Sequence, residues 1–180
     1  EGHIISISPK ASGYITQVLI KDNQEVKKGV LLVSIDPRDY QAKVNTYEAA
    51  ILVAKAEAEK AKSGISVAKA QSDRAETDLK RYENLTASSS ISKQDLDNAR
   101  AASISAKANL DVAINNASSA EAKIIQAQAN LEQAKLELSY TNIYAPQDGR
   151  IAQKHAEEGS FVSIGQPLMA IISYDVWVTA

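Results

Sequence analysis

The sequence predicts an α+β protein in which a small β-sandwich, made of two halves, is interrupted by a long antiparallel α-helical hairpin. Three observations predict it. Glycine and proline gather at the two ends, while the stretch between Pro37 and Pro146 has no proline and a single glycine, Gly64. The two ends resemble each other at a constant offset. The middle has a seven-residue repeat of apolar and small side chains in each of its two parts.

The two end segments, residues 1–36 and 140–173, predict short strands. Both contain runs rich in β-branched side chains that are bounded by turn residues. They match each other at an offset of 136 positions, in the pairs Ile7/Ile143, Gly13/Gly149, Ile15/Ile151, Gln17/Gln153, Val26/Val162, Gly29/Gly165, Leu32/Leu168 and Ile35/Ile171. Neither segment alone could bury a core. We therefore expect the two halves to pack face to face as one sandwich.

The middle segment, residues 37–139, predicts two helices that zip together, with a tip at about residues 85–92. The first part repeats at Val44, Ile51, Ala58, Ile65, Ser72 and Leu79, and three residues on at Tyr47, Ala54, Ala61, Ala68, Ala75 and Tyr82. The second part repeats at Leu96, Ser103, Leu110, Ala117, Ile124, Leu131 and Leu138, and at Ala99, Ala106, Ala113, Ala120, Ala127 and Ala134. These are the a and d positions of a coiled coil. Each helix should have about 45–50 residues, or roughly 70 Å.

The ends of the two helices are marked by capping signals. Asp36-Pro37 offers an N-cap acceptor and a first-turn proline, and Ser92 followed by Asp95 resembles a capping box in which Asp replaces Glu or Gln. Gly64 should cost about 1 kcal/mol relative to alanine. We therefore expect a bend or a soft point there, opposite a polar run at 115–119.

Composition excludes several classes of function. The chain has 20 basic and 22 acidic residues, so a nucleic-acid partner is not expected. Cysteine is absent, which excludes thiolate catalysis, Cys-ligated zinc and disulfides. The two histidines, His3 and His155, lack a metal-ligand spacing, and no catalytic or phosphate-binding motif occurs. We therefore expect no enzymatic activity, no cofactor and no metal site. No apolar run approaches the roughly 18 residues of a membrane span.

The half-repeat of Pro9, Gly13, Ile15, Val26, Gly29 and Leu32 and its later copy resemble the two halves of a lipoyl or biotinyl carrier domain. In such carriers a lysine at a hairpin tip receives the cofactor. Here that point is Asp36-Pro37-Arg38-Asp39, which has no lysine, and the helical segment begins there. A carrier domain is therefore the less favoured interpretation.

A split lipoyl-like domain with a helical hairpin resembles the periplasmic adaptors, also called membrane fusion proteins or HlyD-type proteins. The motifs are Leu32–Pro37 with Tyr40 before the hairpin, then Leu131, Ala134, Leu138, Thr141, Ile143, Ala145, Pro146, Gly149 and Ile151 after it, and Gly159, Val162, Gly165, Pro167 and Leu168 at the close. The last residues, 174–180, resemble the start of the family's β-barrel domain. Together with the order of motifs, they are most similar to EmrA-like multidrug efflux adaptors.

At the tip, Arg81, Leu85 and Ser92 resemble the Arg-Leu-Ser motif with which such hairpins dock on a TolC-type outer-membrane channel. An exposed arginine can donate to carbonyls or carboxylates, leucine supplies an apolar contact, and serine can donate or cap. Residue chemistry alone also allows a structural role for each. Arg81 is then a solvated helix residue, Leu85 packs inside the hairpin end, and Ser92 is an N-cap.

The resemblance implies a non-enzymatic adaptor of a tripartite efflux pump. Its partners would be a TolC-type channel at the tip, an inner-membrane transporter of the major facilitator type, and copies of itself in a ring, which in this family is commonly hexameric. It would lie in the periplasm of a Gram-negative bacterium, with the full-length protein anchored in the inner membrane. Adaptors of ABC-type (type I) secretion systems and of RND pumps are the alternatives.

Overall fold

The computed structural model describes residues 3–86 and 91–173. It divides into two compact units, one formed by residues 1–47 and 130–180 and the other by residues 48–129. Along the chain the elements are β1 (His3–Ile7), β2 (Gly13–Val18), β3 (Glu25–Val26), β4 (Leu31–Ile35), α1 (Arg38–Thr86), α2 (Lys93–Ser139), β5 (Asn142–Tyr144), β6 (Gly149–Ala152), β7 (Phe161–Val162) and β8 (Met169–Ser173).

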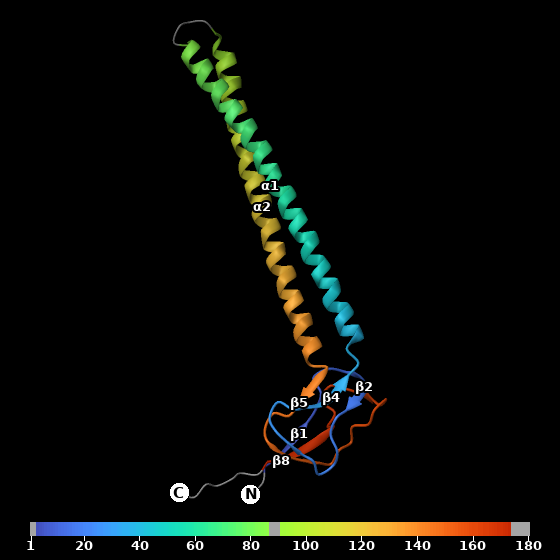
Figure 1. Cartoon of the computed structure of the whole chain (residues 1–180). Coiled ribbons are helices and arrows are strands. Elements are labelled where there is room, and N and C mark those ends of the chain that lie inside the picture. The colour runs from blue at the N-terminus through green and yellow to red at the C-terminus, as the bar shows by residue number, and fades with distance from the viewer. Residues whose placement is uncertain (1–2, 87–90, 174–180) are drawn as a thin grey trace, which may run out of the picture. The chain divides into compact units, whose positions relative to one another are not determined.

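The strands of the first unit form two four-stranded antiparallel sheets, in the orders β1-β8-β6-β3 and β5-β4-β2-β7. Each sheet therefore takes strands from both ends of the chain. Figure 1 shows this as early blue strands lying beside late red ones. Because the pairings cross between the ends, neither end segment could form its sheet alone.

The two sheets are copies of each other. Adding four to each strand number of one sheet, and counting on from β8 to β1, gives the other sheet in the same order. Turn hydrogen bonds repeat at the same offset of 136 residues: the amide of Gly29 donates to the carbonyl of Ala145, and that of Gly165 donates to Pro9. Both glycines have a φ in the left-handed region, +84° and +81°, where a side chain would be strained. The predicted internal repeat is therefore present in three dimensions.

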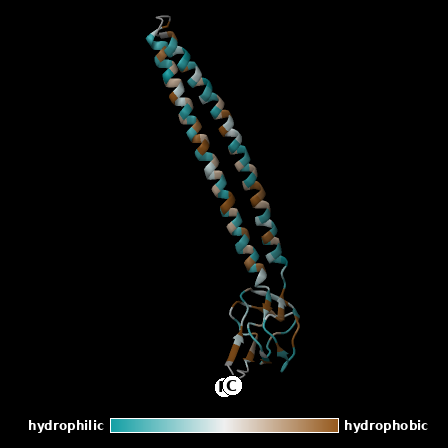
Figure 2. Ribbon diagram, turned by 60° about the vertical axis from the view of Figure 1, so that its left-hand side comes forward, coloured by the Kyte–Doolittle hydropathy of each residue, from teal (hydrophilic) through white to brown (hydrophobic). Residues whose placement is uncertain are grey.

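The core of this unit is made by apolar side chains from both sheets. Leu32, Ile35, Ile151 and Ile171 are fully buried, and Leu168 is 1% exposed. Figure 2 shows the hydrophobic strands of this small unit in brown. Burying a residue of this size contributes about 1.5–3 kcal/mol, so these repeat positions are what hold the sandwich together.

The helices α1 and α2 run side by side as an antiparallel pair (Figure 1). With Val44 and Leu96 at position a of the heptad, every predicted a and d side chain is buried or half-buried. Between Val44 and Tyr82 and between Leu96 and Ala134, the only other position that is not exposed is Asp78. The observed lengths are 49 and 47 residues. Both helices and their common seam are confirmed.

Ion pairs on both sides of the seam fix the axial register between the two helices. Position g pairs with g on one side, in Lys43–Glu137 at 2.7 Å and Glu57–Lys123 at 3.2 Å. We call this side the g flank. Position e pairs with e on the other side, in Lys62–Glu121 at 3.4 Å and Glu83–Arg100 at 3.9 Å, and this is the e flank. Such pairs are typical of antiparallel coiled coils and set the register more than the stability.

The fold class is confirmed: a split β-sandwich is interrupted by an antiparallel helical hairpin. Gly64 lies inside α1, is exposed, and does not interrupt the helix. The expected start of a β-barrel at 174–180 lies outside the described residues. So do residues 87–90 of the tip.

Candidate functional site at the hairpin tip

The candidate site consists of the last turns of α1 and the first turn of α2, where Arg81, Leu85 and Ser92 lie. Ser92 precedes α2 and acts as its N-cap. Its Oγ accepts a hydrogen bond from the amide of Asp95 at 3.1 Å and donates to the Asp95 carboxylate at 2.6 Å. The capping role expected from the sequence is confirmed, and the hydroxyl is already committed within the chain.

Arg81 is positioned by an acidic side chain one turn earlier. Its Nη1 lies 3.2 Å from Oδ1 of Asp78, and the Nε of Arg74 lies 3.9 Å from the other carboxylate oxygen. Asp78 thus stands between two arginines of the same heptad position. The side chain of Arg81 remains 66% exposed, so Asp78 leaves most of it accessible to solvent. The carboxylate restricts where this side chain points without covering it.

Leu85 is 38% exposed at the last turn of α1. It lies four residues after Arg81, so the two side chains share one face of the helix. It occupies position g and therefore belongs to the same flank as Asp78. The structure thus brings Arg81 and Leu85 together on one face, while Ser92 starts the opposite helix.

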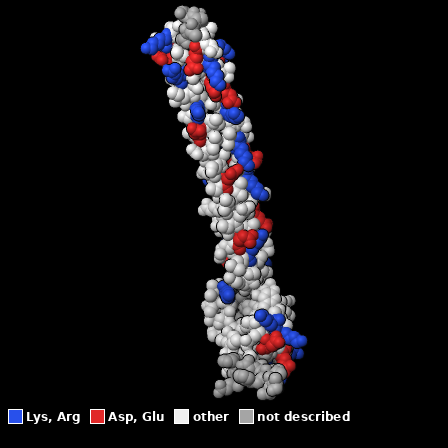
Figure 3. All heavy atoms as spheres, turned by 90° about the vertical axis from the view of Figure 1, so that its left-hand side faces the viewer, with Lys and Arg blue, Asp and Glu red and all other residues white. Residues whose placement is uncertain are grey.

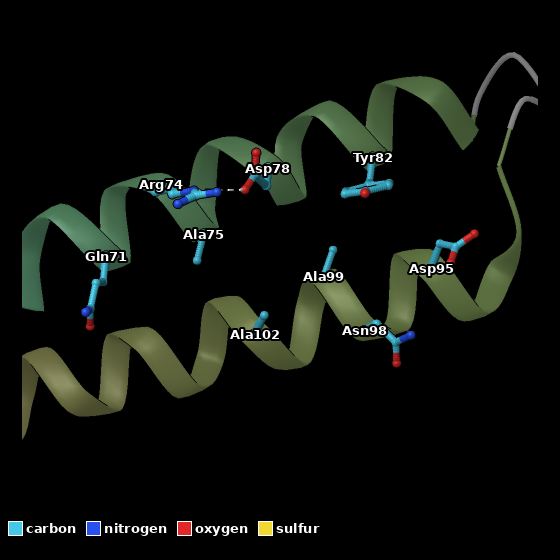
Figure 4. A pocket seen from close by; sticks show the side chains of 9 residues that line it. All are labelled: Gln71, Arg74, Ala75, Asp78, Tyr82, Asp95, Asn98, Ala99 and Ala102. Atoms are coloured by element: carbon cyan, nitrogen blue, oxygen red, sulfur yellow. Dashed lines mark ion pairs between the residues drawn. The ribbon is translucent and has the colours of Figure 1, made fainter.

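A shallow groove of about 520 Å³ lies on the g flank just below these residues. Its floor is made by Ala75, Ala99 and Ala102, whose small side chains leave the space between the helices open. Figure 4 shows Tyr82 pointing from α1 toward α2 at one end of it. The polar lining residues are Gln71, Arg74, Asp78, Asp95 and Asn98. The groove can therefore offer hydrogen-bond donors and acceptors, and one of its lining residues, Asp78, also pairs with Arg81.

Sequence reasoning missed Asp78 and Asn98 as members of this site, and it predicted Asp95 only as the partner of Ser92 in the capping box. Asp78 could have been identified from the sequence. It is a carboxylate at position g, beside the alanine-rich seam, and it has basic residues at i−4 and i+3 on the same face of its helix. Tyr82 was predicted as a seam residue, and it is half-buried there. Its second role as the end wall of a groove depends on the alanines opposite.

The position where a carrier domain would present its lysine has a different role here. Asp36 accepts hydrogen bonds from the amide and the Nε of Arg38, each at 3.0 Å, at the start of α1. These side-chain and backbone hydrogen bonds from Arg38 lower the pKa of Asp36 to about 2. The turn is thus occupied by a helix cap and an ion pair.

Within residues 3–86 and 91–173, no cluster of three or more metal-ligating side chains occurs. The side chain of His155 is exposed, and that of His3 lies outside the described part. Over the same ranges, no helix is long and apolar enough to span a bilayer.

Comparison with known families decides the relationship. Residues 3–174 match the model of the RND membrane fusion protein family, barrel-sandwich hybrid domain. The chain belongs to this family. The match covers both halves of the sandwich and the whole hairpin, as the resemblance in the sequence implied.

Curated relatives are linker proteins of efflux pumps. The chain is 29% identical over 163 residues to the antibiotic efflux pump periplasmic linker protein ArpA of Pseudomonas putida, covering 91% of this chain and 33% of that protein. It is equally similar to the toluene efflux pump periplasmic linker protein TtgA of P. putida strain DOT-T1E, covering 91% and 32%. The chain therefore spans about a third of the length of these relatives.

Solved structures agree on the fold. The periplasmic adaptor protein EmrA aligns with a TM-score of 0.59 at 17% identity, covering 95% of this chain and 72% of that one. MacA from Actinobacillus actinomycetemcomitans aligns with a TM-score of 0.51 at 31% identity, covering 96% and 51%. A MacA-MexA chimera with the Pseudomonas aeruginosa MexA α-hairpin aligns at 0.54 and 26% identity, covering 94% and 48%. The membrane fusion protein architecture is thus shared.

Proposed function

We propose that this chain forms the lipoyl-like and hairpin part of a periplasmic adaptor in a tripartite efflux pump. The adaptor links an inner-membrane transporter to a TolC-type outer-membrane channel. The family match over residues 3–174 supports this, as do curated relatives described as periplasmic linkers of antibiotic and toluene efflux pumps. The complete protein would be anchored in the inner membrane.

The adaptor would act by geometry and not by catalysis. Copies would assemble side by side in a ring, their hairpins forming a conduit, while the transporter supplies the energy. A ligand or partner can shift such an assembly only by binding one of its conformations better than another. The adaptor would therefore seal the path and couple the conformations of its two membrane partners.

The tip would dock on the channel through Arg81 and Leu85. The observation that carries this role is the arrangement around Asp78, which orients Arg81 on the same helix face as the exposed Leu85. A pre-oriented guanidinium loses less conformational entropy when it binds carbonyl or carboxylate acceptors. Ser92 would contribute mainly by holding the first turn of α2, since its hydroxyl bonds to Asp95.

The test is in-cell photo-crosslinking of the complete protein with the probe at Lys93, beside the cap. We expect capture of an outer-membrane channel that weakens with Arg81→Ala and with Leu85→Ala. Matched controls lie on the e flank: Arg100→Ala also removes an exposed arginine near the tip, and Ile114→Ala removes an exposed aliphatic side chain. Both controls should leave capture unchanged.

A second variant separates docking from positioning. Asp78→Asn keeps the size of the side chain but removes the charge that holds Arg81. We expect an intermediate loss of capture in this variant, smaller than that of Arg81→Ala. Capture of other hairpins alone, or capture that Arg81→Ala and Arg100→Ala weaken equally, would contradict docking through this face.

Two transporter classes follow from different observations. Resemblance to EmrA-like adaptors favours a major facilitator partner, whereas the description of the matching family favours an RND partner. Purification of the complete protein from crosslinked membranes, followed by mass spectrometry, distinguishes them, because the recovered transporter belongs to one class or the other.

A further inference from the structure

The two sheets of the sandwich differ at one pair of equivalent cross-strand positions. In the first sheet Glu25 of β3 lies opposite Arg150 of β6, and the two side chains form an ion pair at 2.7 Å. At the offset of 136 positions, the equivalent residues of the second sheet are Tyr14 of β2 and Phe161 of β7, which also lie opposite each other. This place in the fold therefore accepts an exposed ion pair, and the fold does not require aromatic side chains there.

Tyr14 and Phe161 form an aromatic pair that is open to solvent. They are 60% and 55% exposed. Their ring centroids are 5.2 Å apart and their planes meet at 75°, which is an edge-to-face contact. This contact leaves much of both rings uncovered. Because the equivalent position is served by charged side chains, the two exposed rings indicate a surface that contacts a ligand.

A cavity of about 350 Å³ adjoins the aromatic pair. A third ring, that of Tyr40, lines it together with the carboxylates of Asp36 and Asp39 at the start of α1. Its volume is at the small end of the range of small-molecule sites, roughly 300–1,000 Å³. In the first sheet the counterpart of Asp36 is Ile172, so the combination of rings and carboxylates belongs to one half of the repeat alone.

Hydrogen bonds between β2 and the start of α1 hold this cavity in shape. The hydroxyl of Tyr40 donates to the carbonyl of Ser12 at 2.9 Å and accepts from the amide of Ser12 at 3.2 Å. The amide of Asp36 donates to the carbonyl of Tyr14 at 2.8 Å. The hydroxyl of Tyr40 is thus committed within the chain. The cavity is formed without a ligand, so little ordering is needed on binding.

The cavity carries negative charge. Of the described residues that line it, none is lysine or arginine. Asp36 is paired with Arg38 at 2.6 Å, whereas no described residue forms a salt bridge with Asp39. The partial positive charge of the helix N-terminus, roughly +0.5, offsets only part of the charge of Asp39. On the face that Figure 3 shows, by contrast, acidic side chains mostly lie beside basic ones.

We infer that this cavity binds an apolar organic cation, such as a quaternary ammonium compound with an aromatic or alkyl body. The faces of aromatic rings attract cations, and Asp39 adds the opposite charge. The rings of Tyr14 and Phe161 would cover the apolar body of the ligand. The inference deepens the proposed function and rests on it, because such cations would then be one class of compound that the pump exports.

The test measures binding of benzyltrimethylammonium to the complete purified protein by ligand-observed NMR titration. The matched ligand is N,N-dimethylbenzamide, which has a ring and methyl groups but no charge. We expect saturable binding of the cation below about 10 mM, at least about tenfold tighter than binding of the amide. Equal binding of the two compounds, or no saturable binding of the cation in this range, would overturn the inference.

The first half of the repeat supplies the sharpest variant. Tyr14→Arg together with Phe161→Glu places the ion pair of Arg150 and Glu25 at the equivalent positions. The swap removes both rings without changing the net charge, and circular dichroism should show an intact fold. We expect at least about tenfold weaker binding of the cation. Unchanged binding would overturn the inference.

Asp39→Asn separates the charge from the rings. It should weaken binding of the cation about two- to fivefold and leave binding of the neutral amide unchanged. Two control variants should leave both unchanged: Tyr144→Leu removes an exposed ring from the opposite edge of the same sheet, and Glu25→Gln removes an exposed carboxylate from the other sheet. A loss in either control as large as that in Asp39→Asn would overturn the inference.

A photoreactive diazirine derivative of the same cation locates the site. Mass spectrometry should find the label on peptides that contain residues 12–14, 36–40 or 161. Labelling that occurs only elsewhere would overturn the inference, even if the cation binds.

The Lys93 probe in cells separates this inference from the proposed function. Channel capture without binding of the cation refutes the cavity as a site and leaves tip docking standing. Binding of the cation without channel capture refutes docking and leaves the cavity standing.

Discussion

Replacing Gly64 by alanine should stabilise the hairpin. Gly64 lies in the interior of α1 and is exposed. A Cβ added there would have no atom within 4 Å beyond the backbone of its own helical turn. The substitution therefore adds no clash and removes only the excess backbone entropy of glycine. We expect a gain of about 1 kcal/mol in the free energy of unfolding. For a chain of this size that corresponds to a rise in Tm of about 2–4 °C.

Circular dichroism at 222 nm is the appropriate assay, because the two helices dominate this signal. Hydrogen exchange shows where along the hairpin the stabilisation occurs. In the wild type we expect faster exchange at amides around Gly64 than along the rest of the hairpin, and in Gly64→Ala that difference should disappear.

Two other glycines serve as controls with opposite expectations. Gly29 also has open space where a Cβ would lie, but its φ of +84° strains any side chain, so Gly29→Ala should cost about 1–2 kcal/mol. At Gly149 a Cβ would lie 2.5 Å from the carbonyl oxygen of Ile172, so Gly149→Ala should cost about 1–3 kcal/mol. A Gly64→Ala variant that is no more stable than the wild type would refute the reasoning.

Three further predictions concern the cap, the first turn of α1 and the core. Ser92→Ala should lower the free energy of unfolding by about 1 kcal/mol and speed hydrogen exchange in the first turn of α2, whereas Ser92→Thr should keep the cap. Equal hydrogen exchange in the two variants would contradict the capping role. The pKa of Asp36 is lowered in the folded state, so its stabilising contribution is present above its ordinary pKa of 3.8 and is lost as the pH falls toward about 2. Arg38→Gln should move that pKa back up, as an NMR titration would show. Ile151→Ala should cost about 2–5 kcal/mol in urea unfolding of the sandwich, and a loss below 1 kcal/mol would argue against its core role.

The seam of the hairpin could be predicted from the sequence position by position. A heptad pattern is local, and each of its positions has a fixed direction relative to the helix axis. The repeat in the end segments was visible for the same reason, since residues such as Gly29 and Gly165 are fixed by their own turns. Strand pairing was different. That each sheet mixes strands from both ends depends on contacts between residues more than a hundred positions apart, for which no local signal exists.

The site was predictable only in part. Ser92 as a cap follows from a spacing of three residues, and the structure shows it. The ion pair between Asp78 and Arg81 depends on which of several possible partners each of these side chains contacts. The groove depends on alanines of α2 lying level with Tyr82 of α1, and this required the register between the helices. A docking role for Arg81 and Leu85 remains a prediction.

The flank-to-flank pairing of the hairpin makes its length adjustable in discrete steps. Because g pairs with g and e with e, removing seven residues from each helix at one level would return every remaining ion pair to a partner of the same heptad position. Deleting 65–71 together with 110–116 would shorten the rod by about 10 Å while leaving the seam continuous. The distance that the hairpin can bridge can therefore change by whole heptads, without any change in the β-sandwich that precedes and follows it in the chain.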